Sequence, residues 1–212
     1  MQTKRFSYWL TESNNQPIWN MLVGITGGIG SGKSAISRAL RALGYPVYDT
    51  DSEAKRIIVE NKAVRSQIEY LFGSDVFDGD RYRTDVVAQQ VFADGDLLDK
   101  LNKVVHPAVC FDVKHWALKQ NGTCFVESAI LWESGLAELC DTVVEVTAPM
   151  EVRIERTMAR DNASREQVQQ RIASQTRETD IRAHANIILN NNGDFTPTQL
   201  AAELLHRIGI NI

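Results

Sequence analysis

Glycine, lysine and serine are concentrated in residues 24–34, which read GITGGIGSGKS. Within this run, Gly27, Gly32, Lys33 and Ser34 fit the pattern G-x-x-x-x-G-K-[ST] of a phosphate-binding loop. Glycines let successive backbone N–H groups point into one concavity, and a helix starting there adds the positive end of its dipole. We predict that the loop holds a nucleotide triphosphate, with Lys33 at the β- and γ-phosphates and Ser34 binding Mg²⁺. The residues predicted to contact the nucleotide are Gly28, Ile29, Gly30, Ser31, Gly32, Lys33 and Ser34.

Two carboxylates, Asp49 and Asp51, stand in the sequence Y-D-T-D at the end of a predicted strand, residues 46–50. The carboxyl ends of parallel strands face the ligand crevice, so these side chains should point where Lys33 points. A carboxylate there can orient a hydroxyl group, accept its proton, or bind Mg²⁺ through water. The alternative is a structural role, because Thr50-x-x-Glu53 also fits a helix capping box.

Three arginines recur at helical spacing in residues 149–161, PMEVRIERTMARD. Arg153, Arg156 and Arg160 fall at i, i+3 and i+7, which places them on one face of a helix. The planar guanidinium can bind phosphate oxygens in a bidentate way, so we expect at least one of the three to contact phosphate. Two glutamates in the same segment support the alternative of a solvent-facing helix with ion pairs.

The remaining pattern predicts a parallel α/β sheet, because short apolar strands alternate with helices. The predicted strands are residues 22–26, 46–50, 123–127, 141–147 and 185–190. Helical patterns cover residues 34–43, 52–72, 84–119, 149–161, 165–175 and a last helix from Thr196-Pro197 to Gly209. The stretch between the second and third strands is too long for one crossover, so we predict an inserted helical subdomain that binds a second substrate.

Composition narrows the class of protein. The net charge of −4 gives no reason to expect nucleic acid or an anionic membrane as a partner. No apolar run approaches the roughly 18 residues of a membrane span. The cysteines Cys110, Cys124 and Cys140 form no C-x-x-C pair, which favours reduced thiols in a cytoplasmic protein. Residues 1–20 are polar and precede Met21, so we interpret them as an appendage or as the product of a start codon chosen too early.

A P-loop alone does not distinguish among a GTPase, a motor ATPase and a kinase. A GTPase should carry N-K-x-D, but neither Asn61-Lys62 nor Asn102-Lys103 has an aspartate two residues after its lysine. A nucleic-acid-dependent ATPase should present a basic face, which is not evident. A small-molecule kinase needs a base near the γ-phosphate and mobile arginines, and the sequence offers candidates for both in Asp49, Asp51 and the arginines of residues 149–161. A non-catalytic, nucleotide-sensing P-loop protein is the remaining alternative from another class.

Several segments together resemble dephospho-CoA kinases, in the family's order over residues 21–210. They are TGGIGSGKS (26–34), the D-T-D at 49–51, Val105-His106-Pro107, SAILWE (128–133), RTMARDNASREQVQQRIASQ (156–175) and ANIILNNNG (185–193). The first run is far more specific than a generic P-loop. Two positions depart from the family pattern: Ala129 replaces the proline of P-L-L-x-E, and Asn190 replaces the aspartate of I-D-N-x-G.

The resemblance implies ATP-dependent phosphorylation of the ribose 3′-hydroxyl of dephospho-CoA with Mg²⁺, giving CoA and ADP. It also implies that Asp51 is the base, that Lys33 and Arg160 neutralise the transferring phosphoryl group, and that Ser34 binds Mg²⁺. We expect Asp49, His106 and Arg156 to bind substrate, although a histidine beside proline can also be a plain helix-end residue. A kinase for a nucleoside or nucleotide remains the rival enzyme.

The expected fold class is α/β: a P-loop NTPase-type three-layer fold with a five-stranded parallel sheet, a helical substrate-binding insertion and an arginine-bearing lid. The kinase domain should span residues 21–212, with a CoA-binding insertion at about 60–120 and a lid at about 150–176. The expected partners are the small molecules ATP and dephospho-CoA, without nucleic acid or membrane. We expect a cytoplasmic monomer.

Overall fold

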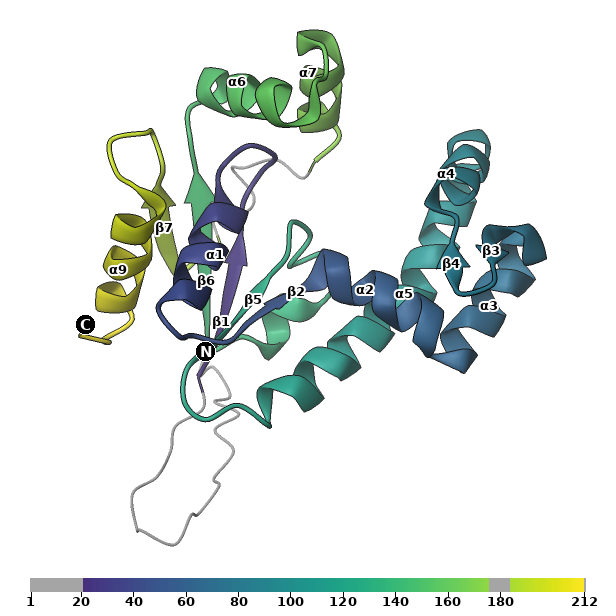
Figure 1. Cartoon of the computed structure of the whole chain (residues 1–212), viewed down its shortest axis with the longest axis horizontal. Coiled ribbons are helices and arrows are strands. Elements are labelled where there is room, and N and C mark those ends of the chain that lie inside the picture. The colour runs from purple at the N-terminus through teal and green to yellow at the C-terminus, as the bar shows by residue number, and fades with distance from the viewer. Residues whose placement is uncertain (1–20, 176–183, 212) are drawn as a thin grey trace, which may run out of the picture.

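The computed structural model describes residues 21–175 and 184–211, and its centre is a five-stranded parallel sheet (Figure 1). The strands lie in the order β2-β5-β1-β6-β7, and neighbouring strands pair in parallel. Their bounds are β1 Leu22–Thr26, β2 Val47–Asp49, β5 Cys124–Glu127, β6 Thr142–Thr147 and β7 Ile187–Asn190. The predicted α/β class and all five predicted strands are therefore confirmed, each to within a few residues.

The central strands consist of apolar runs because they are buried on both faces. All five residues of β1 are buried, and so are the four residues of β5. The register also decides which side chains meet at the carboxyl edge, since Glu127 of β5 lies between Ile25 of β1 and Asp49 of β2. This edge therefore brings the end of the P-loop strand next to two carboxylates.

Helices cover both faces of the sheet and complete the predicted three layers (Figure 1). On one face, α1 (Lys33–Ala42) and α9 (Pro197–Arg207) pack together, with Leu40 and Leu204 among the fully buried side chains. The other face is covered mainly by α5 (Gly95–Ala117) and the short η2 (Leu136–Leu139). The alternation of side chains along each strand explains why one sheet supplies two hydrophobic clusters.

Between β2 and β5 the chain forms a helical unit at one side of the sheet (Figure 1). It contains α2 (Thr50–Glu60), α3 (Lys62–Phe72), η1 (Ser74–Val76), β3 (Phe77–Asp78), β4 (Arg81–Tyr82), α4 (Thr84–Ala93) and α5. The helical patterns at 52–72 and 84–119 each divide into two helices. Asn61 and Asp94 cause the breaks, because their side chains accept backbone N–H groups of the helix that follows.

The capping box that we considered for Thr50 and Glu53 at the start of α2 is wrong. Asp49 is the N-cap, and its Oδ1 accepts the N–H groups of Asp51 at 3.1 Å and Ser52 at 3.4 Å. The residue that ends β2 thus begins the helix. Asp51 is left in the first turn with its carboxylate exposed.

A partly exposed polar contact attaches the helical unit to the sheet. The Tyr48 hydroxyl in β2 donates to Asp112 of α5 at 2.6 Å, and Arg56 of α2 donates to the same carboxylate at 2.7 Å. The ring of Tyr48 also meets Trp116 edge to face at 5.3 Å. These bonds join β2, α2 and α5 at Asp112 and so fix the position of α5 relative to the sheet.

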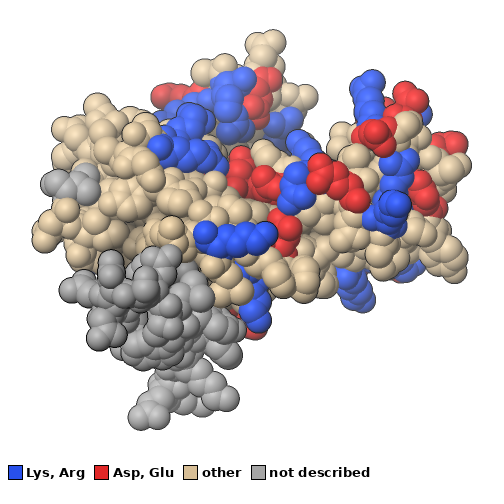
Figure 2. All heavy atoms as spheres, turned by 60° about the horizontal axis from the view of Figure 1, so that its bottom comes forward, with Lys and Arg blue, Asp and Glu red and all other residues tan. Residues whose placement is uncertain are grey.

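Two helices, α6 (Met150–Asp161) and α7 (Arg165–Ala173), lie above the carboxyl end of the sheet, in the segment for which we predict a lid (Figure 1). The helix predicted over residues 149–161 begins at Met150, with Pro149 as its N-cap. The predicted appendage at residues 1–20 and residue 176 of the predicted lid lie outside the described residues. In the described ranges, none of the helices is both long and apolar enough to span a bilayer. Figure 2 shows acidic and basic side chains interspersed over one face.

Candidate active site

The P-loop connects β1 to α1 and is folded around an internal turn in which the N–H of Ser31 donates to the carbonyl of Gly28 at 3.1 Å. Gly30 has a φ of +76°, and a Cβ added there would lie 2.3 Å from the backbone oxygen of Arg153. Helix α1 begins at Lys33, and its N-cap Gly32 has no side chain that could accept the first N–H groups. The predicted residues 28–34 thus form one loop on a helix N-terminus, which suits an anion.

Outside the loop, two side chains hold its carbonyl groups. The Nε of Arg153 donates to the Ile29 carbonyl at 2.8 Å, and the Nδ2 of Asn191 donates to the Ser31 carbonyl at 2.8 Å. In a trans peptide the N–H points opposite to the carbonyl. The N–H groups of Gly30 and Gly32 therefore face away from these anchors, toward the side where phosphate would bind.

Lys33 lies among charges of both signs. Glu127 and Asp51 interact favourably with its ammonium group, while Arg160 and Arg153 oppose it. Burial is the largest effect, and it lowers the pKa of Lys33 below its ordinary value. The structure therefore brings together the three predicted catalytic residues Lys33, Asp51 and Arg160, and it adds Glu127 to them.

The residues beside Lys33 suit a magnesium ion. The Ser34 hydroxyl donates to Oε1 of Glu127 at 2.5 Å, and Glu127 is only 6% exposed at the end of β5. A hydroxyl and a carboxylate are hard oxygen ligands, the class that Mg²⁺ prefers. Ser34 was the predicted metal ligand, and the contact with Glu127 fits such a site.

The three arginines of α6 occupy different environments despite their helical spacing. Arg153 is 2% exposed and bonds the P-loop. Arg156 donates to the Asn191 carbonyl at 3.1 Å, so this predicted substrate-binding residue lies on the nucleotide side. The Arg160 side chain is 64% exposed and pairs with Asp161 at 2.7 Å. One of the three is therefore a buried structural cation and another remains open to solvent near Lys33.

A cavity of about 450 Å³ opens in front of Asp51. It is lined by α2, α5, β4 and the loop after β5, including Tyr82, His106, Ile130 and Asp51 itself. Asp49 does not line this cavity and instead caps α2. Of the predicted substrate-binding residues, His106 alone shares the cavity with Asp51. The cavity's apolar and polar lining suits a small organic acceptor whose hydroxyl group faces Asp51.

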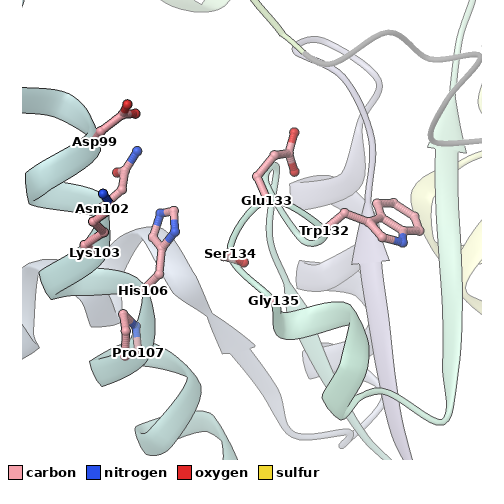
Figure 3. A pocket seen from close by; sticks show the side chains of 9 residues that line it. All are labelled: Asp99, Asn102, Lys103, His106, Pro107, Trp132, Glu133, Ser134 and Gly135. Atoms are coloured by element: carbon pink, nitrogen blue, oxygen red, sulfur yellow. The ribbon is translucent and has the colours of Figure 1, made fainter. Parts of the chain in front are cut away.

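A second recess of about 700 Å³ adjoins the first and shares Asn102, His106 and Ser134 with it. Figure 3 shows α5 on one side and the loop of residues 132–135 on the other, with His106 projecting toward that loop. Burial lowers the pKa of His106, and the carboxylate of Glu133 partly opposes this effect. His106 lies in the middle of α5 and lines both recesses, so the alternative that it is a helix-end residue is wrong.

Two residues of the site were not identified from the sequence. Asn191 is 9% exposed and bonds both the P-loop and Arg156, one position after the departure at Asn190. Gln175 follows α7, and its Oε1 accepts the N–H of Ile29 at 2.7 Å. The position of Asn191 directly after a strand was the one available signal, because strand ends face the crevice. No local pattern marks Gln175.

Comparison with known proteins agrees with this geometry. The family model for dephospho-CoA kinase matches residues 21–196. A dephospho-CoA kinase from Porphyromonas gingivalis is 47% identical over 160 residues, which cover 75% of this chain and 79% of the relative. Another from Dehalococcoides mccartyi is 34% identical over 189 residues, 87% of this chain and 95% of that protein.

Among solved structures, TT1252 from Thermus thermophilus superposes with a TM-score of 0.77 at 34% identity, covering 90% of this chain and 98% of that one. A dephospho-CoA kinase from Campylobacter jejuni has the same fold, with a TM-score of 0.67 at 23% identity over 88% of this chain and 96% of the other. The fold is therefore that of P-loop kinases. The chain belongs to the dephospho-CoA kinase family, whose members phosphorylate dephospho-CoA with ATP in the last step of CoA biosynthesis.

Proposed function

We propose that this chain transfers the γ-phosphoryl group of ATP to the ribose 3′-hydroxyl of dephospho-CoA, at the site formed by the P-loop and the cavity in front of Asp51. The observation that carries the proposal is the position of Asp51. It lines the acceptor cavity and also interacts with Lys33 of the P-loop. A hydroxyl bound in that cavity would meet both the carboxylate that can accept its proton and the cation that binds the donor phosphates.

In this proposal the chemistry is in-line transfer that depends on positioning and charge. Asp51 orients the acceptor hydroxyl and takes its proton as the O–P bond forms. Lys33 and Arg160 neutralise the oxygens of the transferring phosphoryl group. Ser34 and Glu127 are the residues that would hold Mg²⁺, which when bound neutralises phosphate charge. The exposed Arg160 can move toward the nucleotide because Asp161, its partner in the structure, competes only as an ion pair in solvent.

The two adjoining recesses support a division of the acceptor between them. We assign the adenosine end to the cavity of about 450 Å³ that contains Asp51, and the rest of dephospho-CoA to the recess of about 700 Å³. The second recess offers Lys103 for a phosphate group and Asn102 and Ser134 for amide groups. His106 belongs to both recesses and would contact the junction.

The direct test measures ADP release from Mg-ATP with dephospho-CoA, compared with adenosine, AMP, CMP and shikimate as acceptors. Turnover with dephospho-CoA alone supports the proposal. Turnover with another acceptor would retain a kinase and refute the substrate, and ADP release with none of them would favour a nucleotide-binding protein without catalysis.

Asp51→Asn tests the role of the base. The amide keeps the size of the carboxylate but cannot accept the proton, so kcat should fall about 10²- to 10⁴-fold. The Kd of ATP, measured by calorimetry, should change by less than about threefold because the loop is intact. Asp75→Asn, at an exposed position of η1, is the matched control and should keep wild-type turnover. Near-normal turnover of Asp51→Asn would refute the assignment.

We propose a cytoplasmic monomer. The support for the compartment is the presence of three free thiols, since Cys110, Cys124 and Cys140 are all unpaired by disulfides. Burial raises the pKa of each of these thiols, to about 12 for Cys124, which keeps them protonated and unreactive. Light scattering of the purified protein measures the mass directly, and a dimer mass would overturn the monomer.

A further inference from the structure

Both backbone polar groups of Ile29, in the P-loop, are bonded by the lid segment. The N–H donates to Oε1 of Gln175, which follows Ser174, the C-cap of α7, at 2.7 Å. The carbonyl accepts from Nε of Arg153, in α6, at 2.8 Å. One residue of the phosphate-binding loop is therefore bonded to α6 and to the segment just after α7, over sequence separations of 124 and 146 residues.

The two attachments differ in character. Arg153 is buried, and α6 approaches the loop so closely that a Cβ on Gly30 would lie 2.3 Å from the Arg153 backbone oxygen. Pulling α6 away would leave a buried guanidinium without this partner, which is costly. Gln175 is only partly buried and offers a neutral acceptor, so its bond contributes less than the charged bond from Arg153. Gln175 is thus the attachment that a single substitution can remove without leaving a buried charge.

The neutral amide matters because of what the loop binds. A carboxylate would accept the Ile29 N–H more strongly than an amide does. It would also place a negative charge next to a loop whose other N–H groups face phosphates, and like charges repel. An amide oxygen provides the hydrogen bond without that repulsion.

We propose that Gln175 is a positioning residue for phosphoryl transfer: its amide oxygen fixes the Ile29 N–H and so sets the P-loop against the lid without adding charge beside the nucleotide. This inference rests on the phosphate-binding role proposed for the loop. The position of α6 relative to the loop also affects Arg160, which lies seven residues after Arg153 on the same helix and interacts with Lys33. The attachment fixes how far apart the P-loop cation and the lid cation stand when nucleotide binds.

The test uses two variants of the full chain and one control. Gln175→Met keeps the length of the side chain and removes the acceptor, and Gln175→Glu keeps the acceptor and adds a charge. Gln170→Glu adds the same charge at an exposed position of α7. The readouts are the Kd of ADP by calorimetry at 0.05 M and 0.5 M KCl, kcat with saturating substrates, and the Tm of the nucleotide-free protein.

The expected order of ADP affinity is wild type, then Gln175→Met, then Gln175→Glu. We expect about a tenfold loss for Met, and a larger loss for Glu that shrinks at the higher salt concentration because ions screen the added charge. Values of kcat should fall in both variants, whereas Gln170→Glu should match the wild type. Tm should change little, because Gln175 lies at the end of a surface helix.

Two results would overturn the inference. If Gln175→Glu binds ADP as well as the wild type, the hydrogen bond is purely structural and the amide has no role beside phosphate. If Gln175→Met keeps wild-type affinity and kcat, the bond does not position the loop. A wild-type chain that fails to bind ADP at all would instead refute the proposed function of the loop, so the two failures are distinguishable.

Discussion

Replacing Gly30 by alanine tests how closely the P-loop must fit against α6. The residue has a φ of +76°, where an L side chain costs about 1–2 kcal/mol. The added Cβ would also lie 2.3 Å from the Arg153 carbonyl oxygen and 2.7 Å from Oγ1 of Thr157. Ordinary contact begins at 3.4 Å, so the loop and α6 must separate by about 1 Å. Because the nearer atom belongs to the backbone, no side-chain rotation can relieve the clash.

Gly44→Ala provides the matched control for this strain. Gly44 has a φ of +90°, and no atom of the described residues comes within 4 Å of a Cβ built there. Both variants should therefore lose a similar 1–2 kcal/mol or so of stability from strain, about 2–4 °C in Tm per kcal/mol for a chain of this size. Gly30→Ala should lose more stability than Gly44→Ala, because only Gly30→Ala also has the clash with α6. The difference between the two isolates the contact between the loop and α6.

Nucleotide affinity is the decisive readout. A displacement of about 1 Å in a phosphate-binding loop can cost up to about 10²-fold, so we expect the Kd of ADP for Gly30→Ala to rise by about 10- to 100-fold. Gly44→Ala should bind ADP like the wild type, since it lies at the far end of α1. Calorimetric titration of both variants with ADP measures the two constants. Unchanged affinity in Gly30→Ala, or an equal loss in Gly44→Ala, would refute the reasoning.

Three further predictions follow from the same geometry. Glu127→Gln removes the carboxylate that accepts from Ser34, so the Mg²⁺ concentration that gives the half-maximal rate should rise by about tenfold. The control Glu133→Gln, in the second recess, should leave that concentration unchanged. An unchanged Mg²⁺ requirement in Glu127→Gln would show that Glu127 does not bind the metal. Because burial lowers the pKa of Lys33, its charge is lost as pH rises through that lowered value, and the Kd of ADP should increase before pH 10.5. Lys33→Arg should abolish this dependence because its guanidinium stays charged, and a flat profile in the wild type would contradict the lowered pKa. Leu40→Ala creates a cavity between α1 and α9 at a fully buried position and should cost about 2–5 kcal/mol in urea unfolding, and a loss below about 1 kcal/mol would show that the helices repack.

The P-loop and the sheet could be predicted from the sequence because both are encoded locally. Residues 28–34 need only glycines, one lysine and one serine in a fixed order between an apolar strand and an amphipathic helix. The strands are short apolar runs because β1 and β5, at the centre of the sheet, are buried on both faces. The helix breaks at Asn61 and Asp94 were missed because one side-chain hydrogen bond can end a helix whose apolar pattern continues past it.

Similar residue types take different roles in the structure. Asp49 and Asp51 stand two positions apart in one Y-D-T-D run, and only the resemblance to the kinase family gave them different predicted roles. In the structure, Asp49 accepts the first N–H groups of α2, and this hydrogen bonding leaves Asp51 open to the acceptor cavity. In the same way Arg153 is buried against the P-loop while Arg160 remains exposed, although both follow one helical spacing.

The hydrogen bonds that hold the P-loop depend on the tertiary structure alone. Ile29 and Ser31 are held by Arg153, Gln175 and Asn191, which come from α6, the end of α7 and the end of β7, more than 120 residues farther along the chain. The sequence determined that a phosphate-binding loop exists, because glycine and lysine act through their own backbone and charge. It could not determine what holds the loop, because a hydrogen bond between distant segments depends on where the sheet places them, and no local spacing records that.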